Sequence, residues 1–250
     1  MCMKKMFFFL LLPLVVMLSA CDEGDIVEKT TAYKSGGYVV KMTGSIANMD
    51  SWPDGYDVVV AVFNEDKDAD HYVSAKRIPT TYDGSAFVYH VSDVIGAYTS
   101  IRLCVVNNLH MPVMNVDTLY SVETSVVSGD TIYYDASGKD VAMFKAVTDM
   151  FEKESCTQCH VNSKAAGKLG LKAADAYAQL VNVTSNHYPN ESDAVFFKRV
   201  VPGNADTSLL YKVLMVDTIL TGYNHVSHIQ TKKNEYLVRT LVRDWINNEK

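Results

Sequence analysis

The sequence predicts two domains, an N-terminal all-β antiparallel sandwich over residues 38–135 and a mostly α-helical domain over residues 140–250. Three observations lead to this prediction. The first region is a series of short runs rich in Val, Ile, Tyr and Thr, the stretch 128–138 is rich in Gly, Ser and Asp, and the remainder has apolar residues at helical spacing. A chain of 250 residues that is 48% hydrophobic is long enough for two small cores.

The first twenty residues predict an export signal that is not part of the fold. A pair of lysines precedes an apolar run, Met6–Leu18, which ends in small residues. Leu18-Ser19-Ala20-Cys21 resembles the lipobox of bacterial lipoproteins, in which the chain is cut before the cysteine and that cysteine is lipidated. We therefore expect a signal peptide over residues 1–20, lipidation of Cys21 and a lipidated stalk over residues 21–37. The alternatives are an ordinary signal peptide or a short membrane anchor, with Cys21 incidental.

Charge and anchor together predict the location. The formal net charge of −6 becomes −8 when the two lysines of the signal leave, so we expect no nucleic acid among the partners. Contact with a membrane is expected through acyl chains on Cys21. The acidic residues that follow, Asp22-Glu23-Gly24-Asp25, are similar to an inner-membrane retention signal in enteric bacteria and to a surface-export signal in other lineages. The expected location is the cell envelope of a Gram-negative bacterium, at the outer membrane, with the periplasmic or surface face left open.

Residues 38–135 predict the antiparallel strands of an Ig-like or similar sandwich. Turn residues such as Asp83-Gly84 and Asn107-Asn108 separate the runs, and no convincing helical pattern lies among them. The predicted strands are Tyr38–Ile46, Tyr56–Asn64, Tyr72–Ile78, Ser85–Val91, Thr99–Asn107 and Thr118–Val127.

Helical patterns follow the boundary. Asp140 is suited to cap a helix that leads directly into Cys156, and a second amphipathic stretch closes the chain. The apolar faces that predict these helices are Val141, Phe144, Val147, Thr148 and Phe151 for the first, and Leu237, Leu241, Val242 and Trp245 for the last.

Cys156-Thr157-Gln158-Cys159-His160 is the pattern that carries chemistry. Two thiols separated by two residues can each add to a vinyl group of haem, and a histidine directly after the second can bind the iron from one face. Export favours this interpretation, because such attachment happens outside the cytoplasm. Three others stay open, namely a redox dithiol, a zinc site with further ligands, and a structural disulfide. Cys104 lies in an apolar run and is typical of a small buried hydrophobe.

Beyond this motif, the C-terminal region resembles the cytochrome c-like domains of bacterial surface and periplasmic proteins. The resemblance implies a mostly α cytochrome c-like fold for residues 140–250, with one covalently bound haem c per chain. Cys156 and Cys159 would attach the haem, and His160 would be the proximal ligand of its iron. The segments that carry the resemblance are Gly170-Leu171 with Ala176–Val183, Arg199–Tyr211 and Arg243–Ile246.

The sequence departs from that family at the sixth ligand of the iron. The family normally supplies a methionine there, often as Met-Pro. Counting back from the closing helix, the corresponding place falls in Gly222-Tyr223-Asn224-His225-Val226-Ser227-His228. His225 is the first candidate for the distal ligand, His228 the second and Met215 the third. A histidine in place of methionine lowers the reduction potential.

These observations predict a lipid-anchored single-haem c-type cytochrome that acts in electron transfer at the cell envelope, with redox partner proteins. We expect an electron carrier rather than a catalyst. The alternative is a surface binding lipoprotein whose β domain recognises a glycan or a protein, with an accessory haem domain. A haem enzyme or sensor would need an open or displaceable sixth position.

Overall fold

The computed structural model describes residues 38–64, 68–84, 87–94, 100–121, 131–162, 164, 166–185, 198–217, 219, 223–230 and 234–250. All of these residues belong to one compact unit, Gly36–Lys250. The predicted signal peptide, Cys21 and the stalk lie outside the described residues. No helix in the described part of the chain is long and apolar enough to cross a membrane.

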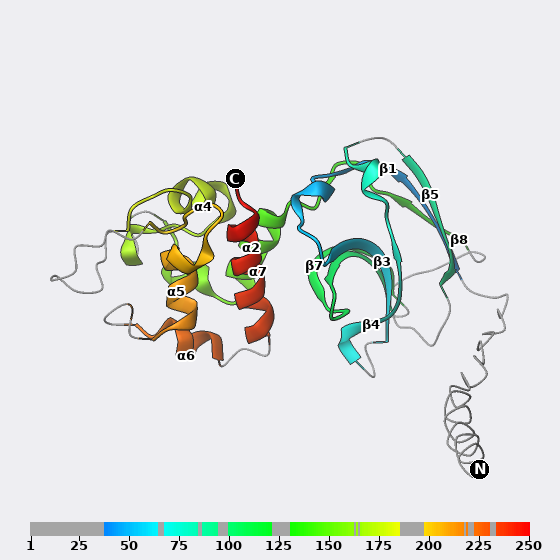
Figure 1. The fold of residues 1–250 in the computed structure, drawn as a ribbon. Coiled ribbons are helices and arrows are strands. Elements are labelled where there is room, and N and C mark those ends of the chain that lie inside the picture. Colours follow the sequence, from blue (N-terminus) through cyan, green and yellow to red (C-terminus); the bar gives the residue numbers. More distant parts are fainter. Residues whose placement is uncertain are drawn as a thin grey trace, which may run out of the picture. The chain divides into compact units, whose positions relative to one another are not determined.

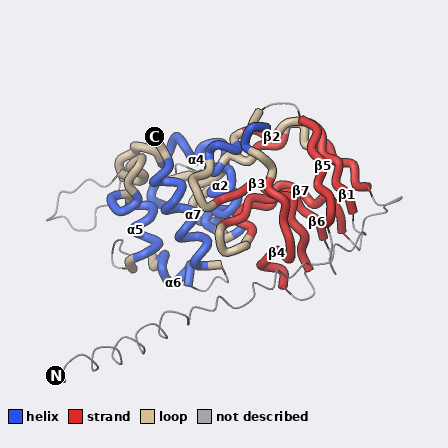
Figure 2. The backbone as a smooth tube through the Cα atoms, turned by 45° about the vertical axis from the view of Figure 1, so that its right-hand side comes forward, coloured by secondary structure: helices blue, strands red, loops and turns tan. Residues whose placement is uncertain are grey.

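Strands form the N-terminal part of the described chain and helices form the C-terminal part, as the sequence predicts (Figures 1 and 2). The larger sheet has four antiparallel strands in the order β4-β3-β6-β7. Its two central strands are buried on both faces, which explains their nearly continuous apolar sequence. The strand bounds are β3 Tyr56–Asn64, β4 Asp68–Arg77, β6 Ser100–Asn107 and β7 Pro112–Ser121.

A three-stranded sheet, in the order β5-β1-β8, and a two-stranded sheet, β2-β9, complete the described strands. Here the expectation of purely antiparallel pairing is wrong, because β1 pairs with β8 and β2 with β9 in parallel. Each parallel pair joins segments far apart in the sequence, as a crossover connection requires. The bounds are β1 Tyr38–Gly44, β2 Ile46–Ala47, β5 Phe87–Val94, β8 Thr131–Asp135 and β9 Lys139–Asp140.

Four predicted strands have different bounds in the structure. Two of them are the predicted strands Tyr72–Ile78 and Ser85–Val91: β4 begins at Asp68 and β5 ends at Val94. The other two are the first and the last. The first breaks at Gly44, whose φ is +106° and where a Cβ atom would collide with the backbone nitrogen of Ser137. The last predicted strand is shifted, because β7 covers Pro112–Ser121, and residues 122–130 lie outside the described part.

The helices pack their apolar faces inward, and the first one begins later than predicted. Asp140 is not its N-cap: the residue lies in β9, and its Oδ1 accepts a hydrogen bond from the Ala142 backbone nitrogen at 2.9 Å. The helices are α2 Met143–Lys153, α3 Cys156–Cys159, α4 Ala173–Leu180, α5 Leu209–Met215, α6 His225–Gln230 and α7 Glu235–Asn248. Short 3-10 turns lie at Met49–Ser51, Thr80–Tyr82, Ala166–Lys168 and Ala205–Thr207.

One continuous apolar cluster runs from the strands into the helices. Alternate residues of β1 and β3, including Met42 and Val60, share this cluster with Phe151 of α2 and Trp245 of α7. The opposite face of β3 forms a small separate cluster around Phe63. Because the main cluster is continuous, the elements around the motif are braced by the same core as the sheets.

Candidate functional site

The two motif cysteines lie on a single helical turn. Helix α2 ends at Lys153, and Ser155 then adopts a left-handed conformation with φ +67°, which breaks the helix before α3 begins at Cys156. Residues three apart on a helix share a face, so Cys156 and Cys159 point to the same side of this turn. Cys156 is half-buried against the main apolar cluster, whereas Cys159 is exposed.

His160 directly follows this turn, and the loop after it fixes the ring. The Nδ1–H of His160 donates to the Ala166 carbonyl at 3.0 Å, and the His160 carbonyl accepts from the Leu171 backbone nitrogen at 2.9 Å. Burial lowers the pKa of His160, while hydrogen bonds to the backbone of Ala166 and Leu169 raise it in part. With Nδ1 protonated, the neutral ring carries its lone pair on Nε2, which is the form of imidazole that binds metals.

His225, the first residue of α6, lies next to His160. The two ring centroids are 6.2 Å apart and the ring planes are inclined by 23°. Burial is the largest cause that lowers the pKa of His225, and the neighbouring His160 and His228 lower it further. The site therefore brings together two imidazoles that are both held in the neutral form.

His228 lies near this pair, but both of its ring nitrogens are engaged elsewhere. Its Nε2 is 2.8 Å from the Glu154 carbonyl oxygen, and its Nδ1 is 3.0 Å from the Tyr223 hydroxyl. A metal ligand needs an unshared lone pair on a ring nitrogen. This arrangement favours His225 over His228 as a ligand.

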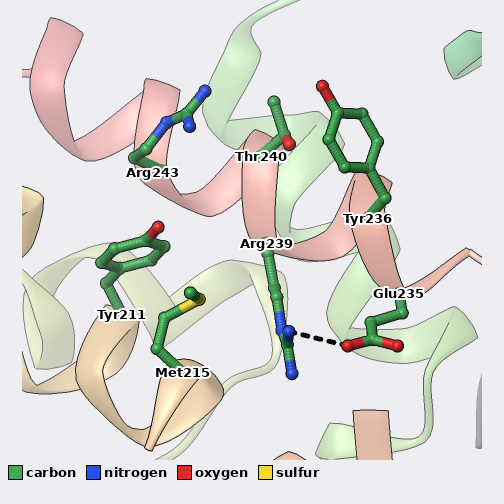
Figure 3. A pocket seen from close by; sticks show the side chains of 7 residues that line it. All are labelled: Tyr211, Met215, Glu235, Tyr236, Arg239, Thr240 and Arg243. Carbon is green, nitrogen blue, oxygen red and sulfur yellow. Dashed lines mark ion pairs between the residues drawn. The ribbon is translucent and has the colours of Figure 1, made fainter. Parts of the chain in front are cut away.

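Met215, the third candidate, lies at the end of α5 in a groove of about 320 Å³ between α5 and α7 (Figure 3). Its side chain is 42% exposed. In the same groove Arg239 forms an ion pair with Glu235 at 2.7 Å, and its Nε and Nη2 are the buried side-chain atoms without a partner among the described residues. The structure thus places His225, rather than Met215, beside the His160 ring.

Sequence reasoning missed the role of Arg199, which holds the loop behind His160. Arg199 is only 6% exposed, and its guanidinium donates to three backbone carbonyls: those of Gln179 at 2.8 Å, Gly167 at 3.0 Å and Lys168 at 3.1 Å. The last two follow Ala166, which accepts the hydrogen bond from His160. No sequence signal marks such a contact, because the partners are backbone atoms of distant segments.

Cys104, which the sequence predicts to be a buried hydrophobe, lies outside this site, and so do the aromatic residues Trp52 and Tyr72 of the β region. Cys104 is buried in β6, where desolvation raises the pKa of its thiol to about 12, as expected for a core residue. The indole of Trp52 donates to the Val141 carbonyl at 2.6 Å, and the Tyr72 ring stacks on His110 at 4.8 Å between centroids. Each of these two aromatic side chains is therefore occupied within the fold.

Comparison of the chain with protein-family models, with curated proteins and with solved structures found no match. Within the described residues, no three His, Cys, Asp or Glu side chains are grouped as they would be around a metal held by protein ligands alone. A haem iron needs fewer ligands from the protein, because the porphyrin supplies the equatorial nitrogens and the protein supplies only the axial ligands. The described residues that could hold a haem are therefore Cys156 and Cys159 on one helical turn, His160 directly after it, and His225 beside His160.

Proposed function

We propose that this chain is a lipid-anchored, single-haem c-type cytochrome that transfers electrons in the envelope of a Gram-negative bacterium. In this proposal Cys156 and Cys159 attach the haem covalently, His160 is the proximal ligand, His225 is the distal ligand, and lipid on Cys21 anchors the chain. When bound, the haem supplies an iron that takes up and releases one electron. The chain holds this group, sets its potential and presents it to redox partner proteins.

The observation that carries the proposal is the separation of the two imidazoles. The ring centroids of His160 and His225 are 6.2 Å apart, and the ring planes are inclined by 23°. A metal–nitrogen bond of about 2.0–2.1 Å, and a ring nitrogen about 1.2 Å from its centroid, give roughly 6–6.5 Å between the centroids of two imidazoles on opposite sides of one metal. The observed spacing agrees with a shared metal, and the adjacent turn supplies the two thiols that anchor a haem.

The protein itself sets the orientation of His160 and the protonation state of both imidazoles. The Ala166 carbonyl fixes the tautomer and orientation of His160, as the hydrogen-bonded partners of metal-binding histidines generally do. Partial burial lowers the pKa of His160 and that of His225, which favours the neutral form of both rings. A second imidazole, in place of a thioether, supports a low reduction potential.

An electron carrier is favoured over a haem enzyme or sensor, because a catalyst needs an open or displaceable position on the iron. In this proposal His225, whose ring centroid is 6.2 Å from that of His160, would fill that position. The finer features of the fold belong to the same proposal: α2 and α3 present the motif, and α7 closes a cytochrome c-like domain. The sheets form an Ig-like or similar sandwich that serves as a platform and follows the lipidated stalk along the chain.

Haem attachment is tested on the soluble form from Asp22 to Lys250, expressed with haem-attachment machinery. We expect a denaturing gel stained for haem to show one covalent haem, and the alkaline pyridine haemochrome to indicate two saturated vinyl groups. Cys156→Ala and Cys159→Ala should each move the haemochrome band toward that of haem with one free vinyl, and the double variant should lose covalent haem. Cys104→Ala is the matched control and should keep both thioether bonds. Absence of covalent haem in the unaltered chain would overturn the proposal.

A further inference from the structure

His228 contacts the segment that leads into the haem motif, although it lies 74 positions further along the chain. A carbonyl oxygen only accepts, so the Nε2–H of His228 donates to the Glu154 carbonyl over 2.8 Å. In the neutral ring Nδ1 is then the acceptor, and the Tyr223 hydroxyl donates to it over 3.0 Å. One side chain thus joins the end of α2 to the residues just before α6.

The same helix carries the two histidines on one face. Asn224 precedes α6, and its side-chain oxygen accepts a hydrogen bond from the Ser227 backbone nitrogen at 2.8 Å, which fixes the start of the helix. His225 and His228 are three positions apart, so both face the α2–α3 junction. His228 contacts Glu154, which precedes α3, and His225 lies next to His160, which follows α3.

The ring of Tyr223 connects the two contacts. Its hydroxyl bonds to His228, and its ring meets the His225 ring edge to face at 5.0 Å between centroids. Tyr223 therefore contacts both histidines of α6. Three side chains form one unit that holds α6 against the motif.

We infer that His228 is a positioning residue and not an iron ligand: it sets the distance between His225 and His160 by tying Tyr223 and α6 to the Glu154 carbonyl. The inference rests on the proposed haem site for its functional meaning. The contact itself is a property of the chain, so it is open to measurement with and without haem.

The holo-protein test compares His228→Ala with His228→Gln. A glutamine side chain keeps an N–H for the Glu154 carbonyl and an oxygen for the Tyr223 hydroxyl, but it does not replace imidazole as an iron ligand. We expect both variants to keep a low-spin spectrum. In His228→Ala the affinity of the reduced iron for carbon monoxide should rise roughly 5–10-fold, as the loss of about one net hydrogen bond implies. His228→Gln should stay within about twofold of the unaltered protein.

Two controls make the result decisive. His225→Gln should give a high-spin iron that binds carbon monoxide readily, and His71→Gln, at an exposed pair with Asp68 in β4, should change nothing. A high-spin iron in both His228 variants would make His228 the ligand and overturn the inference. Unchanged carbon monoxide affinity in His228→Ala would overturn it as well.

A haem-free measurement separates this inference from the proposed function. In the full soluble chain expressed without attachment machinery, amide hydrogen exchange over residues 225–230 should be roughly 5–10-fold faster in His228→Ala and near normal in His228→Gln. If the chain shows this pattern but takes up no haem even when expressed with attachment machinery, the proposed function is refuted and the positioning contact is kept. Equal amide exchange rates in the unaltered chain, His228→Ala and His228→Gln would show that the contact does not hold α6, and would overturn the inference.

Discussion

At the scale of single residues, Arg199 is the side chain on which the loop behind His160 most depends. Arg199→Ala leaves three backbone carbonyls without their donors, so we expect the free energy of unfolding to fall by about 3 kcal/mol. Arg199→Lys should fall in between, because an ammonium lacks the planar fork that reaches several acceptors. Urea unfolding measures both. Lys198→Ala, at an exposed neighbour, should change stability by less than about 0.5 kcal/mol; an equal loss there would contradict the role of Arg199.

At the scale of single residues, the sequence predicts those functional residues that belong to a contiguous motif. Cys156, Cys159 and His160 are visible because the motif is contiguous, and His225 is suggested by its distance from the closing helix. The hydrogen bond of His228 that favours His225 as the ligand cannot be predicted from the sequence, because its partner, the Glu154 carbonyl, is a backbone atom 74 positions away. Arg199 is missed for the same reason, since its partners are backbone carbonyls of helix α4 and of the turn Ala166–Lys168.

At the scale of elements, Asp117 of β7 ties three strands together. Its Oδ2 accepts from Lys139 of β9 at 2.7 Å and from the Tyr134 hydroxyl of β8 at 3.0 Å. The hydrogen bond from Lys139 is the largest cause that lowers the pKa of Asp117. Burial raises this pKa in part, and the hydrogen bond from Tyr134 lowers it further.

The lowered pKa fixes the sign of a pH dependence. The stabilisation by Asp117 is full above the unfolded pKa of about 4 and is lost as pH falls through the lower folded value. Because the pair is partly exposed, we expect Asp117→Asn to cost less than about 1 kcal/mol at pH 7, with the difference from the unaltered protein shrinking as the pH falls below about 4. Thermal melts of both chains across this range measure it. Asp54→Asn, in an exposed turn, is the control; a gap for Asp117→Asn that widened in acid would refute the assignment.

The elements themselves were predictable where their patterns were long. The strand Tyr56–Asn64 matches its prediction because a central strand needs continuous apolar residues. The pairing of β1 with β8 was not predictable, because β8 has only five residues and one of them, Tyr133, is 76% exposed. The start of α2 was misplaced because Asp140 uses its carboxylate to support the turn before the helix.

At the scale of the whole molecule, the continuous core predicts one cooperative unfolding transition for residues 36–250. Calorimetry should give equal calorimetric and van't Hoff enthalpies, whereas two separate transitions would indicate two independently folding domains.

The hydroxyl of Tyr56 in β3 donates a hydrogen bond to Asp244 of α7 at 2.8 Å. Tyr56→Phe should lower Tm by roughly 2–4 °C while keeping a single transition, because about 1 kcal/mol is lost from the whole unit.

The central claim is that His160 and His225 hold one covalently attached haem iron from both sides. The most direct measurement is the optical spectrum of the purified soluble chain, oxidised and reduced, with and without carbon monoxide, beside that of His225→Ala. We predict a low-spin, six-coordinate iron that binds carbon monoxide only weakly when reduced, and a high-spin iron that binds carbon monoxide readily in the variant. A high-spin, carbon monoxide-binding iron already present in the unaltered chain, or a chain without covalent haem, would contradict it.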